Sequence, residues 1–247
     1  EIGISRQDIT PKVGCYLYGY RPDLESEYVL DNLTLTTFAF SYGKTKAIMI
    51  TLSVCMIATE LCTTLRKEIA EKTGVPFDNI LISCTHTHSG PPLCDMPGWG
   101  GIDYEYYNEI LEPKVLLSAT QAVNALEPAT VCVASGKSKI GINRRYVRED
   151  NTIALGQNPW GPYNPEMTVI SFKGEKGNIL GNIIHYGLHG TCAGSAPAIS
   201  RDWSGIMVDE LEKVSGGYAA FFNGPEGDVG PRISNGRTTG VNDVKYT

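Results

Sequence analysis

The sequence predicts an α/β fold in which helices flank a mixed β-sheet. Three observations support this prediction: a β-hairpin near the start, helical and strand-like segments that alternate after it, and irregular Gly/Pro-rich segments that follow strands. The chain has 247 residues, of which 42% are hydrophobic and 19% charged, an ordinary globular composition. The length fits one large domain or two small ones.

The predicted elements follow from local patterns along the chain. Residues 33–41 alternate apolar and polar side chains, and a turn containing Gly43 leads into the apolar residues 47–54, which predicts a hairpin. Residues 58–72 have helical spacing, with Gly74 as the stop signal. Residues 103–126 are mostly helical in pattern, and Pro113 should kink or divide that helix. Further strands are expected at residues 80–84, 130–134, 167–172, 179–184 and 219–222, and a helix at residues 202–214 with Asp202 as its N-cap.

Three Gly/Pro-rich segments follow predicted strands, at residues 89–101, 190–200 and 223–236. Loops beyond the carboxyl ends of sheet strands are where α/β proteins place their ligand sites. We therefore expect the functional site in these loops.

Charge, hydropathy and cysteine usage exclude several classes of protein. A net charge of -6 argues against a nucleic-acid partner, because phosphate binding needs a basic surface. The longest nearly apolar run, residues 47–58, is shorter than the ~20 residues of a membrane-spanning helix. The seven cysteines form no CxxC pair and should be mostly reduced, buried thiols, although Cys94 and Cys192 lie close enough to a histidine to be weighed as ligands. Unpaired cysteines favour a cytoplasmic location, and export stays open because the chain does not begin with Met.

All four histidines fall in two short motifs, His86-Thr87-His88 and His185 to His189. In extended backbone, an HxH pair places both side chains on one face with Cα atoms about 7 Å apart, so that both imidazoles can reach one ion. The second pair would share a face on a helix, but its surroundings resemble the end of a strand, and His185 fits a core role equally well. The two motifs predict a metal or catalytic site built from at least two histidines.

Two further segments carry candidate site residues. Arg144, in the Gly-Ile-Asn-Arg-Arg segment, can hold a carboxylate or an oxyanion with its guanidinium, or it can belong to a solvated charge cluster. Asp228, in the Gly-rich segment after residues 219–222, can bind a metal or orient a histidine, or it can be a solvated turn residue. The sequence contains no P-loop, no GxSxG nucleophile elbow, no HxHxDH motif and no HExxH motif.

Taken in order, these motifs resemble the neutral/alkaline non-lysosomal ceramidase family, specifically its amino-terminal catalytic domain. The resemblance covers essentially the whole chain, and the Thr-His-Thr-His-Ser-Gly-Pro core is its most specific part. The matching segments are residues 8–11, 19–20, 31–33, 79–91, 141–144, 189–191 and 227–229. On this basis residues 1–247 are expected to be a single ceramidase-like amino-terminal α/β domain.

The resemblance implies a zinc-dependent amidase of sphingolipid metabolism, which cleaves the N-acyl bond of a small-molecule or lipid-like substrate through a metal-activated water. It assigns His86 and His189 as zinc ligands. It places His88 beside the substrate and assigns Arg144 to substrate positioning and oxyanion stabilisation, and Asp228 completes the set of candidate catalytic residues.

The chain also departs from the family pattern. The family's other two zinc ligands, a Glu and a Tyr, come from a later stretch, so the natural protein is expected to continue beyond Thr247. Gly230 replaces a serine tied to ceramide hydrolysis, and Arg145 and Glu226 add charge, which favours a related amide or ester substrate over ceramide itself. The sequence does not specify an oligomeric state.

Two other functions fit part of the same evidence. One is a ceramidase-like domain that binds metal without turning over substrate, which Gly230 would explain. The other is an amidohydrolase-type metal hydrolase, which also begins with HxH but needs a (β/α)₈ barrel and additional histidine ligands. The early hairpin and the count of four histidines argue against this second alternative.

Overall fold

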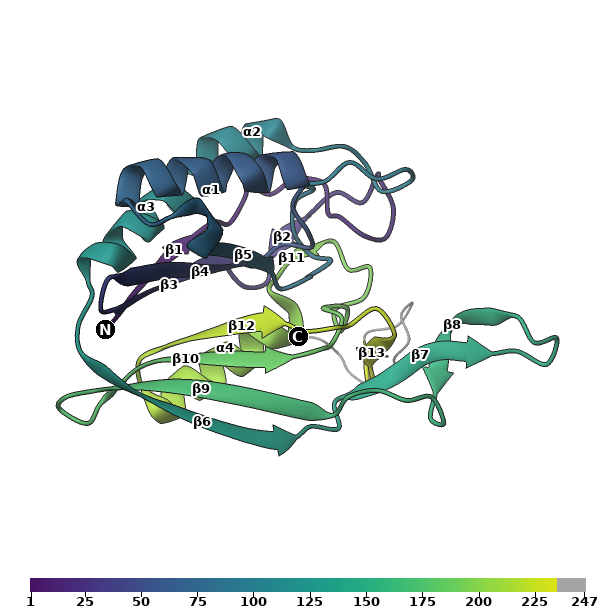
Figure 1. Cartoon of the computed structure of the whole chain (residues 1–247). Coiled ribbons are helices and arrows are strands. Elements are labelled where there is room, and N and C mark those ends of the chain that lie inside the picture. Colours follow the sequence, from purple (N-terminus) through teal and green to yellow (C-terminus); the bar gives the residue numbers. More distant parts are fainter. Residues whose placement is uncertain (235–247) are drawn as a thin grey trace.

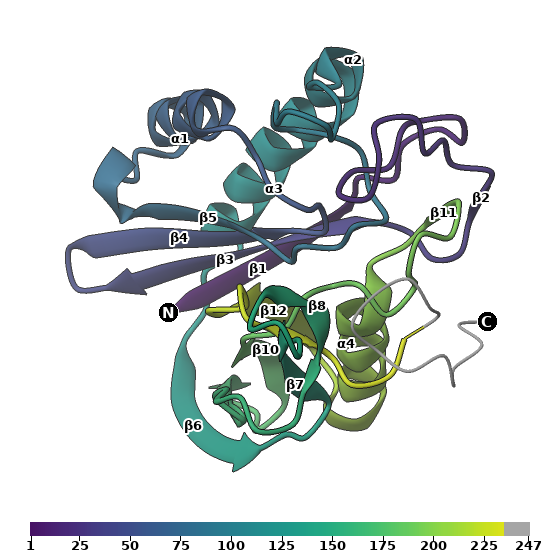
Figure 2. The same ribbon diagram turned by 90° about the vertical axis from the view of Figure 1, so that its right-hand side faces the viewer.

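The computed structural model describes residues 1–234 and has four layers. Two four-stranded β-sheets pack face to face, and helices cover the outer face of each sheet (Figures 1 and 2). Each sheet contains both parallel and antiparallel neighbours, so the predicted α/β class with mixed sheets and flanking helices is confirmed. Within residues 1–234, no helix is both long and apolar enough to cross a membrane.

The first sheet is built from the amino-terminal third of the chain. Its strands, in spatial order, are β1 (Ile2–Asp8), β3 (Thr34–Tyr42), β4 (Thr45–Leu52) and β5 (Ile80–Cys84). The predicted hairpin is β3–β4, paired antiparallel, and β5 adds parallel to β4. Helix α1 (Thr59–Thr73) buries Leu65 and Ile69 against this sheet and ends at Gly74 in the left-handed conformation, as the stop signal predicts.

The predicted helix over residues 103–126 is divided. It consists of α2 (Tyr104–Tyr106), a π-helical turn (Tyr107–Leu111) and α3 (Glu112–Asn124). Pro113 lies in the first turn of α3, directly after the π-helical turn, so the hydrogen-bonding pattern of the helix changes where Pro113 was predicted to kink or divide it. The α3 face that carries Val115, Ala119 and Ala122 is buried in the same core as α1.

The second sheet supplies the other half of the site. Its strands, in spatial order, are β12 (Tyr218–Asn223), β10 (Ile179–Tyr186), β9 (Glu166–Gly174) and β6 (Ala129–Lys137). Helix α4 (Asp202–Ser215) packs on its outer face, where Trp203 lies with its ring centroid 4.8 Å from that of Phe221. Between the two sheets, Phe38, Phe172 and Phe222 belong to one buried apolar cluster.

Several short elements complete the described chain. They are a 3-10 turn (Phe77–Asn79), the parallel pair β2 (Tyr28–Val29) and β11 (Ala198–Ile199), and a small sheet of β7 (Gly141–Val147), β8 (Ile153–Asn158) and β13 (Val229–Pro231). The sequence analysis predicted none of these, and it also missed β1. Their strand pairing is set by tertiary contacts more than by an alternating pattern of their own.

One predicted cap is wrong. Arg201 holds the N-cap position of α4, and Asp202 is the first helical residue, with a positive φ of 58°. The buried Asp202 carboxylate instead accepts N–H groups from Cys192, Ala193 and Trp203, at 2.8–3.0 Å. These hydrogen bonds join the loop after β10 to the start of α4. The Asp202 carboxylate therefore binds backbone N–H groups of that loop instead of acting as a local helix cap.

Candidate metal centre

Three loops meet at the candidate site, each following the carboxyl end of a strand, as predicted. His86 follows β5, His189 follows β10 and Glu226 follows β12. An isolated parallel bridge joins Thr87 to Gly190, and the His88 N–H donates to the Gly190 carbonyl at 3.1 Å. The His189 N–H donates to the carbonyl of Val229 at 3.2 Å. Backbone hydrogen bonds therefore fix the two histidine motifs and the Gly-rich loop relative to one another.

Three of the four histidine rings lie together. Their centroids are 4.7 Å apart for His86 and His189, 4.9 Å for His86 and His88, and 5.9 Å for His88 and His189. His185 is not in this cluster, since its side chain is exposed on β10, where it pairs with Thr168 and Phe222 of the neighbouring strands. The two motifs therefore contribute unequally: two histidines come from the first and one from the second.

The orientation of His86 and His189 suits metal binding. Nδ1 of His86 lies 2.9 Å from the carbonyl oxygen of Cys55, and Nδ1 of His189 lies 2.9 Å from the carbonyl oxygen of Glu226. Because a carbonyl only accepts, the proton of each neutral imidazole is on Nδ1, which leaves the lone pair of Nε2 free. A metal-binding histidine typically has its other ring nitrogen held in this way. The residues present therefore fit a metal ion.

The backbone at His86 differs from the expected extended conformation. Its φ is 62°, in the left-handed region that few non-glycine residues adopt. The His86 N–H donates to the Val54 carbonyl at 3.0 Å, and the next residue, Thr87, forms the bridge to Gly190. The chain therefore turns at His86, between the hydrogen bond to Val54 and the bridge to Gly190. Backbone strain of this kind is often stored at functional sites.

His88 lies deeper, in an aromatic environment. It is only 6% exposed, and its ring centroid lies 5.2 Å from that of Tyr20 and 5.8 Å from that of Trp99. Gly19 has a φ of 117°, and a Cβ there would lie 2.2 Å from Nδ1 of His88, so only glycine leaves room for the ring. Within residues 1–234 neither ring nitrogen of His88 has a hydrogen-bond partner of ordinary geometry, which points to a ligand at this position.

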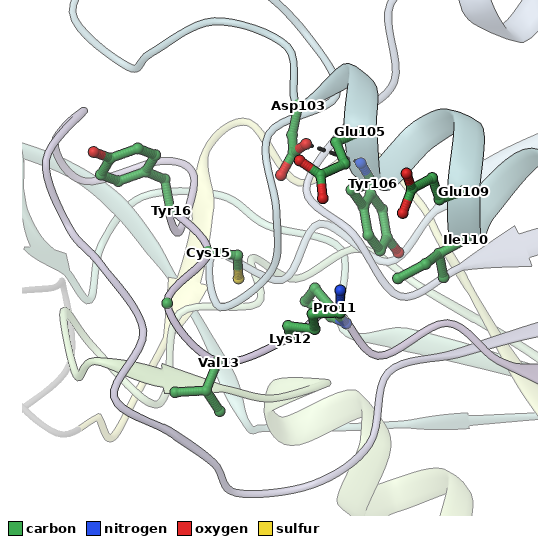
Figure 3. Close-up of a pocket in the computed structure, with 11 residues that line it drawn as sticks. Pro11, Lys12, Val13, Cys15, Tyr16, Asp103, Glu105, Tyr106, Glu109 and Ile110 are labelled. Carbon is green, nitrogen blue, oxygen red and sulfur yellow. Dashed lines mark hydrogen bonds between the residues drawn. The ribbon is translucent and has the colours of Figure 1, made fainter.

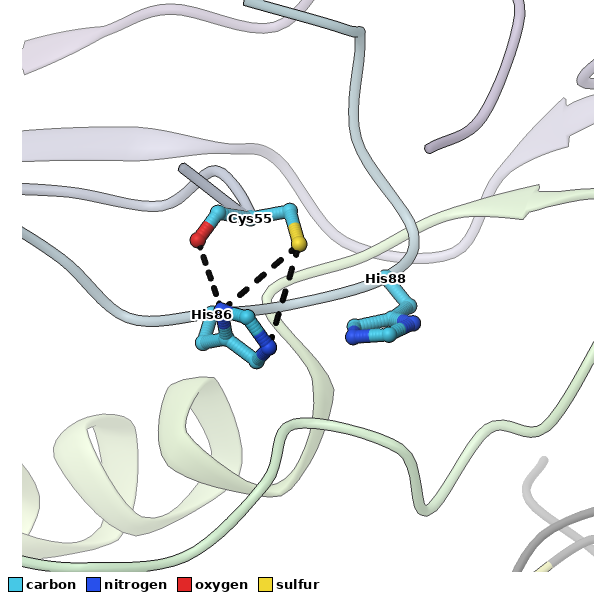
Figure 4. Close-up of side chains that lie close together, drawn as sticks. All are labelled: Cys55, His86 and His88. Atoms are coloured by element: carbon cyan, nitrogen blue, oxygen red, sulfur yellow. Dashed lines mark hydrogen bonds between the residues drawn. The ribbon is translucent and has the colours of Figure 1, made fainter. Parts of the chain in front are cut away.

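Two groups of side chains can hold an ion in the described part of the chain. In the first, His86, His189 and Glu226 each offer a ligand atom, and these atoms lie within 4.8 Å of one another. The second group, Cys55, His86 and His88, meets the same criterion and is shown in Figure 4. Neither group found within residues 1–234 contains Cys94 or Cys192, the cysteines considered from sequence.

Glu226 was noted from sequence only for its charge, yet its carboxylate enters the site. Oε1 lies 3.3 Å from Nδ1 of His86, and Oε2 accepts a hydrogen bond from the side-chain amide of Asn223. Cys55, which the sequence analysis did not single out, contacts the same imidazole through its carbonyl oxygen and its Sγ (Figure 4). No spacing rule in the sequence connects either residue to the histidines.

Burial keeps the site uncharged in the absence of metal. It lowers the pKa of His189 to about 3, with Arg144 and His86 adding to the effect. Burial likewise lowers the pKa of His86, and lowers that of His88 well below its ordinary value. Burial raises the pKa of Glu226 to about 8, although Asn223 and Arg144 oppose the change. The imidazoles are therefore neutral near pH 7, as metal ligation requires.

These pKa values predict how the stability of the metal-free chain depends on pH. The pKa of His189 is about 3 in the folded chain, against an ordinary value of 6.5. As the pH falls from 6.5 towards 3, the unfolded chain takes up this proton first, so the free energy of unfolding decreases by about 1 kcal/mol per pH unit. Glu226, with a folded pKa of about 8 against 4.5, has the opposite effect, because the folded chain takes up its proton first as the pH falls.

Glu226→Gln removes the carboxyl group whose protonation stabilises the folded chain as the pH falls. In the presence of a chelator, the free energy of unfolding of Glu226→Gln should therefore fall more steeply between pH 6.5 and 4.5 than that of the wild type, by about 1 kcal/mol per pH unit. Urea unfolding at several pH values measures both slopes. Equal slopes for the two proteins would contradict the assignment of a raised Glu226 pKa.

Arg144 and Asp228 are held beside the cluster by the small sheet. β13 pairs antiparallel with β7, and the Arg144 N–H donates to the Asp228 carbonyl at 2.8 Å. Nε of Arg144 donates to the Gly227 carbonyl at 3.1 Å, and its charge acts on His86 and His189. The half-buried Asp228 carboxylate belongs to neither metal-capable group of residues 1–234, and it lies close enough to act electrostatically on Arg144.

A separate hollow lies between the loop at residues 11–16 and the start of the divided helix (Figure 3). Cys15, Asp103, Glu105, Tyr106 and Glu109 are among the residues that line it, and Asp103 accepts the Tyr106 N–H at 2.9 Å. None of its lining residues belongs to the histidine cluster. It is therefore a different surface feature from the candidate metal centre.

The known proteins to which this chain is similar include several ceramidases. Neutral ceramidase A of Dictyostelium discoideum is 27% identical over 206 residues, which are 75% of this chain and 29% of that protein. A solved structure described as a ceramidase complexed with C2 superposes with a TM-score of 0.78 at 21% identity, covering 94% of this chain and 38% of the other. The crystal structure of neutral ceramidase from Pseudomonas aeruginosa gives a TM-score of 0.76 at 20% identity, covering 98% of this chain and 41% of the other.

These comparisons establish the fold and the family. The chain spans less than half the length of each of these relatives. The family model for the amino-terminal part of neutral/alkaline non-lysosomal ceramidases matches residues 1–243. The chain therefore belongs to the neutral/alkaline non-lysosomal ceramidase family.

Proposed function

We propose that this chain forms the metal-binding part of a zinc-dependent hydrolase that cleaves an amide (N-acyl) bond with a metal-activated water. One observation carries the proposal: the His86 and His189 rings lie 4.7 Å apart, and each donates through Nδ1 to a backbone carbonyl. Both Nε2 lone pairs are therefore free for one ion. Histidine nitrogens are preferred zinc ligands, and catalytic zinc sites keep one position open for water or substrate.

When bound, zinc would lower the pKa of a coordinated water to about 7 and polarise the carbonyl under attack. The remaining roles belong to residues of this chain. His88 is buried, and neither ring nitrogen has a hydrogen-bond partner of ordinary geometry within residues 1–234, which supports a role for His88 in hydrogen-bonding the substrate amide. The Arg144 guanidinium, whose position is set by Gly227, is placed to stabilise the negative charge that develops on the carbonyl oxygen. Asp228 supports the orientation of Arg144 through its charge.

The substrate is proposed to be a small-molecule or lipid-like amide. The relatives named above are ceramidases, which supports an N-acyl bond as the target. Gly230 lies buried in β13, at the position of the family serine, and offers no side chain to a substrate. A related amide or ester is therefore proposed in preference to ceramide itself.

Hydrolysis of a panel of N-acyl and ester substrates tests this function directly. The zinc-loaded full-length protein should release fatty acid or carboxylate from at least one amide, and a chelator should abolish the release until zinc is restored. Full activity in metal-free protein would contradict the proposal. Stoichiometric zinc binding without turnover of any substrate would instead favour the alternative of a metal-binding domain that has lost its chemistry.

The amidohydrolase alternative conflicts with the fold. Such an enzyme needs a (β/α)₈ barrel with ligands on several barrel strands. Residues 1–234 instead form two packed mixed sheets with small accessory sheets.

A further inference from the structure

We propose that Thr87 is a positioning residue for His88, because its hydroxyl joins the His86-Thr87-His88 motif to Ser200 and so fixes the backbone that carries the His88 ring. The inference rests on the proposed function, in which His88 hydrogen-bonds the substrate amide. Thr87 is not itself a catalytic residue, since it acts through its neighbour. It is the one residue of the motif to which the sequence assigns no role.

Ser200 is hydrogen-bonded to the chain on both sides of His88. The Thr87 hydroxyl donates to the Ser200 carbonyl at 2.7 Å, and the Ser200 N–H donates to the Ser89 carbonyl at 2.9 Å. The same Thr87 oxygen accepts the Ser89 N–H at 3.2 Å. Thr87, Ser89 and Ser200 are each at most 1% exposed, so water has little access to these hydrogen bonds. The residues before and after His88 are therefore both held by Ser200.

A second attachment holds the motif from the other end of the same segment. Thr87 pairs with Gly190 in a parallel bridge, and the His88 N–H donates to the Gly190 carbonyl at 3.1 Å. Gly190 and Ser200 are the first and last residues of the Gly/Pro-rich segment 190–200. The chain around His88 is therefore hydrogen-bonded to both ends of that segment.

Ser200 is itself anchored to helix α4. Its hydroxyl donates to the Asp31 carboxylate and accepts the Asp202 N–H at 2.9 Å. The other Asp31 oxygen accepts from the backbone N–H and from Nε of Arg201, at 2.9 and 3.0 Å. The Arg201 guanidinium also donates to both carboxylate oxygens of Asp209 in α4, at 2.9 and 2.7 Å. Because a bidentate ion pair fixes the geometry of its partners, Ser200 is a rigid support for the Thr87 hydroxyl.

The His88 ring depends on this support more than the His86 ring does. Nδ1 of His86 is held by the Cys55 carbonyl, whereas within residues 1–234 neither ring nitrogen of His88 has a hydrogen-bond partner of ordinary geometry. The position of the His88 ring is therefore set by its backbone and by packing against neighbouring aromatic rings. A backbone shift next to His88 should displace its ring while His86 keeps its own anchor. Loss of the Thr87 hydroxyl should thus impair turnover more than zinc binding.

Steady-state kinetics and zinc analysis of the full-length, zinc-loaded protein test the inference. Thr87→Val keeps the shape of the side chain and removes the hydroxyl. Its kcat should fall by about 10–100-fold, because small misplacements of a catalytic group have effects of this size. Its zinc content should stay at the wild-type value. Thr87→Ser retains the hydroxyl and should restore most of the lost kcat.

Thr51→Val is the matched control for Thr87→Val. It removes another buried threonine hydroxyl that donates to a backbone carbonyl, that of Phe221, at 2.7 Å. Both valine variants should lower the melting temperature to a similar extent, since each loses a buried hydrogen bond of the same kind. Thr51→Val should nevertheless keep the wild-type kcat.

Hydrogen–deuterium exchange of the metal-free, full-length protein tests the same contact without an activity assay. In Thr87→Val, the backbone N–H groups of His88 and Ser89 should exchange roughly 3–10-fold faster than in the wild type, because a hydrogen bond that restrains local opening is lost. Thr87→Ser should exchange like the wild type. Asp31→Asn, which weakens the anchor of Ser200, should accelerate exchange at the same two positions.

The outcomes separate this inference from the proposed function. A kcat loss in Thr87→Val that Thr87→Ser restores, with zinc retained and faster exchange, supports the inference. Wild-type kcat and wild-type exchange in Thr87→Val would overturn it. An equal kcat loss in Thr51→Val would also overturn it, because lost stability would then be the cause. Absence of zinc-dependent hydrolysis by the wild type would reject the proposed function, and the exchange rates would then decide whether Thr87 holds the His88 backbone.

Discussion

Replacing His86 or His189 by alanine should lower the zinc content of the full-length protein from about one ion per molecule to near zero and abolish hydrolysis. Each ring presents one free Nε2 to the site, and each is held by a backbone carbonyl, that of Cys55 or of Glu226. Removing either imidazole leaves too few ligands to hold an ion tightly. Metal analysis after gel filtration measures the stoichiometry, and hydrolysis is assayed on the same samples.

His185→Ala is the matched control for these two variants. The His185 side chain is exposed on β10 and lies outside the ring cluster, so this variant should keep its zinc and its activity. Zinc retained at wild-type stoichiometry in both His86→Ala and His189→Ala would contradict the proposed metal centre. Loss of zinc in His185→Ala alone would show that the second motif binds through the other histidine.

Gly190→Ala should separate the two histidine motifs without removing a ligand. A Cβ at Gly190 would lie 2.7 Å from the carbonyl oxygen of His86 and 2.9 Å from Cα of Thr87, and both are backbone atoms that cannot rotate away. The bridge between Thr87 and Gly190 would have to open. Overpacking of this kind costs about 1–3 kcal/mol of folding free energy. Because the displaced segment carries His86, zinc affinity should also fall, by roughly 10-fold or more.

Gly101→Ala is the control for this substitution. A Cβ at Gly101 would meet no atom within 4 Å, and its backbone is outside the left-handed region. Chemical denaturation and zinc titration of both variants give the comparison. Wild-type stability and affinity in Gly190→Ala would show that the close contact between the two loops does not hold the site together.

The fold could be predicted from sequence where the local pattern and the tertiary structure agree. The hairpin of β3 and β4, the strand β5 and the helices α1 and α4 were all expected within a few residues of their observed bounds. Strands β1, β7 and β13 were missed, because their pairing depends on partners far away in sequence. Asp202 was placed as a helix cap because a sequence window does not contain the loop amides that it binds.

Only part of the candidate site could be predicted from the sequence, because some of its residues are brought together by tertiary contacts. The grouping of the histidines pointed to His86, His88 and His189, whose rings do lie together. Glu226 was noted only as an added charge, and Cys55 only as one of seven cysteines expected to be mostly buried thiols. Both reach His86 through tertiary contacts made by separate loops, and no short motif encodes such contacts. The left-handed backbone of His86 could not be predicted either, since it depends on the His86 hydrogen bond to Val54 and on the bridge between Thr87 and Gly190.

The most direct test of the central claim is a crystal structure of the zinc-soaked chain with anomalous diffraction recorded at the zinc absorption edge. We predict one strong peak about 2.0–2.1 Å from Nε2 of His86 and from Nε2 of His189, with Nδ1 of each ring still bonded to its carbonyl. A zinc ion bound through the Nδ1 atoms, a peak remote from both rings, or no peak at this position would contradict it.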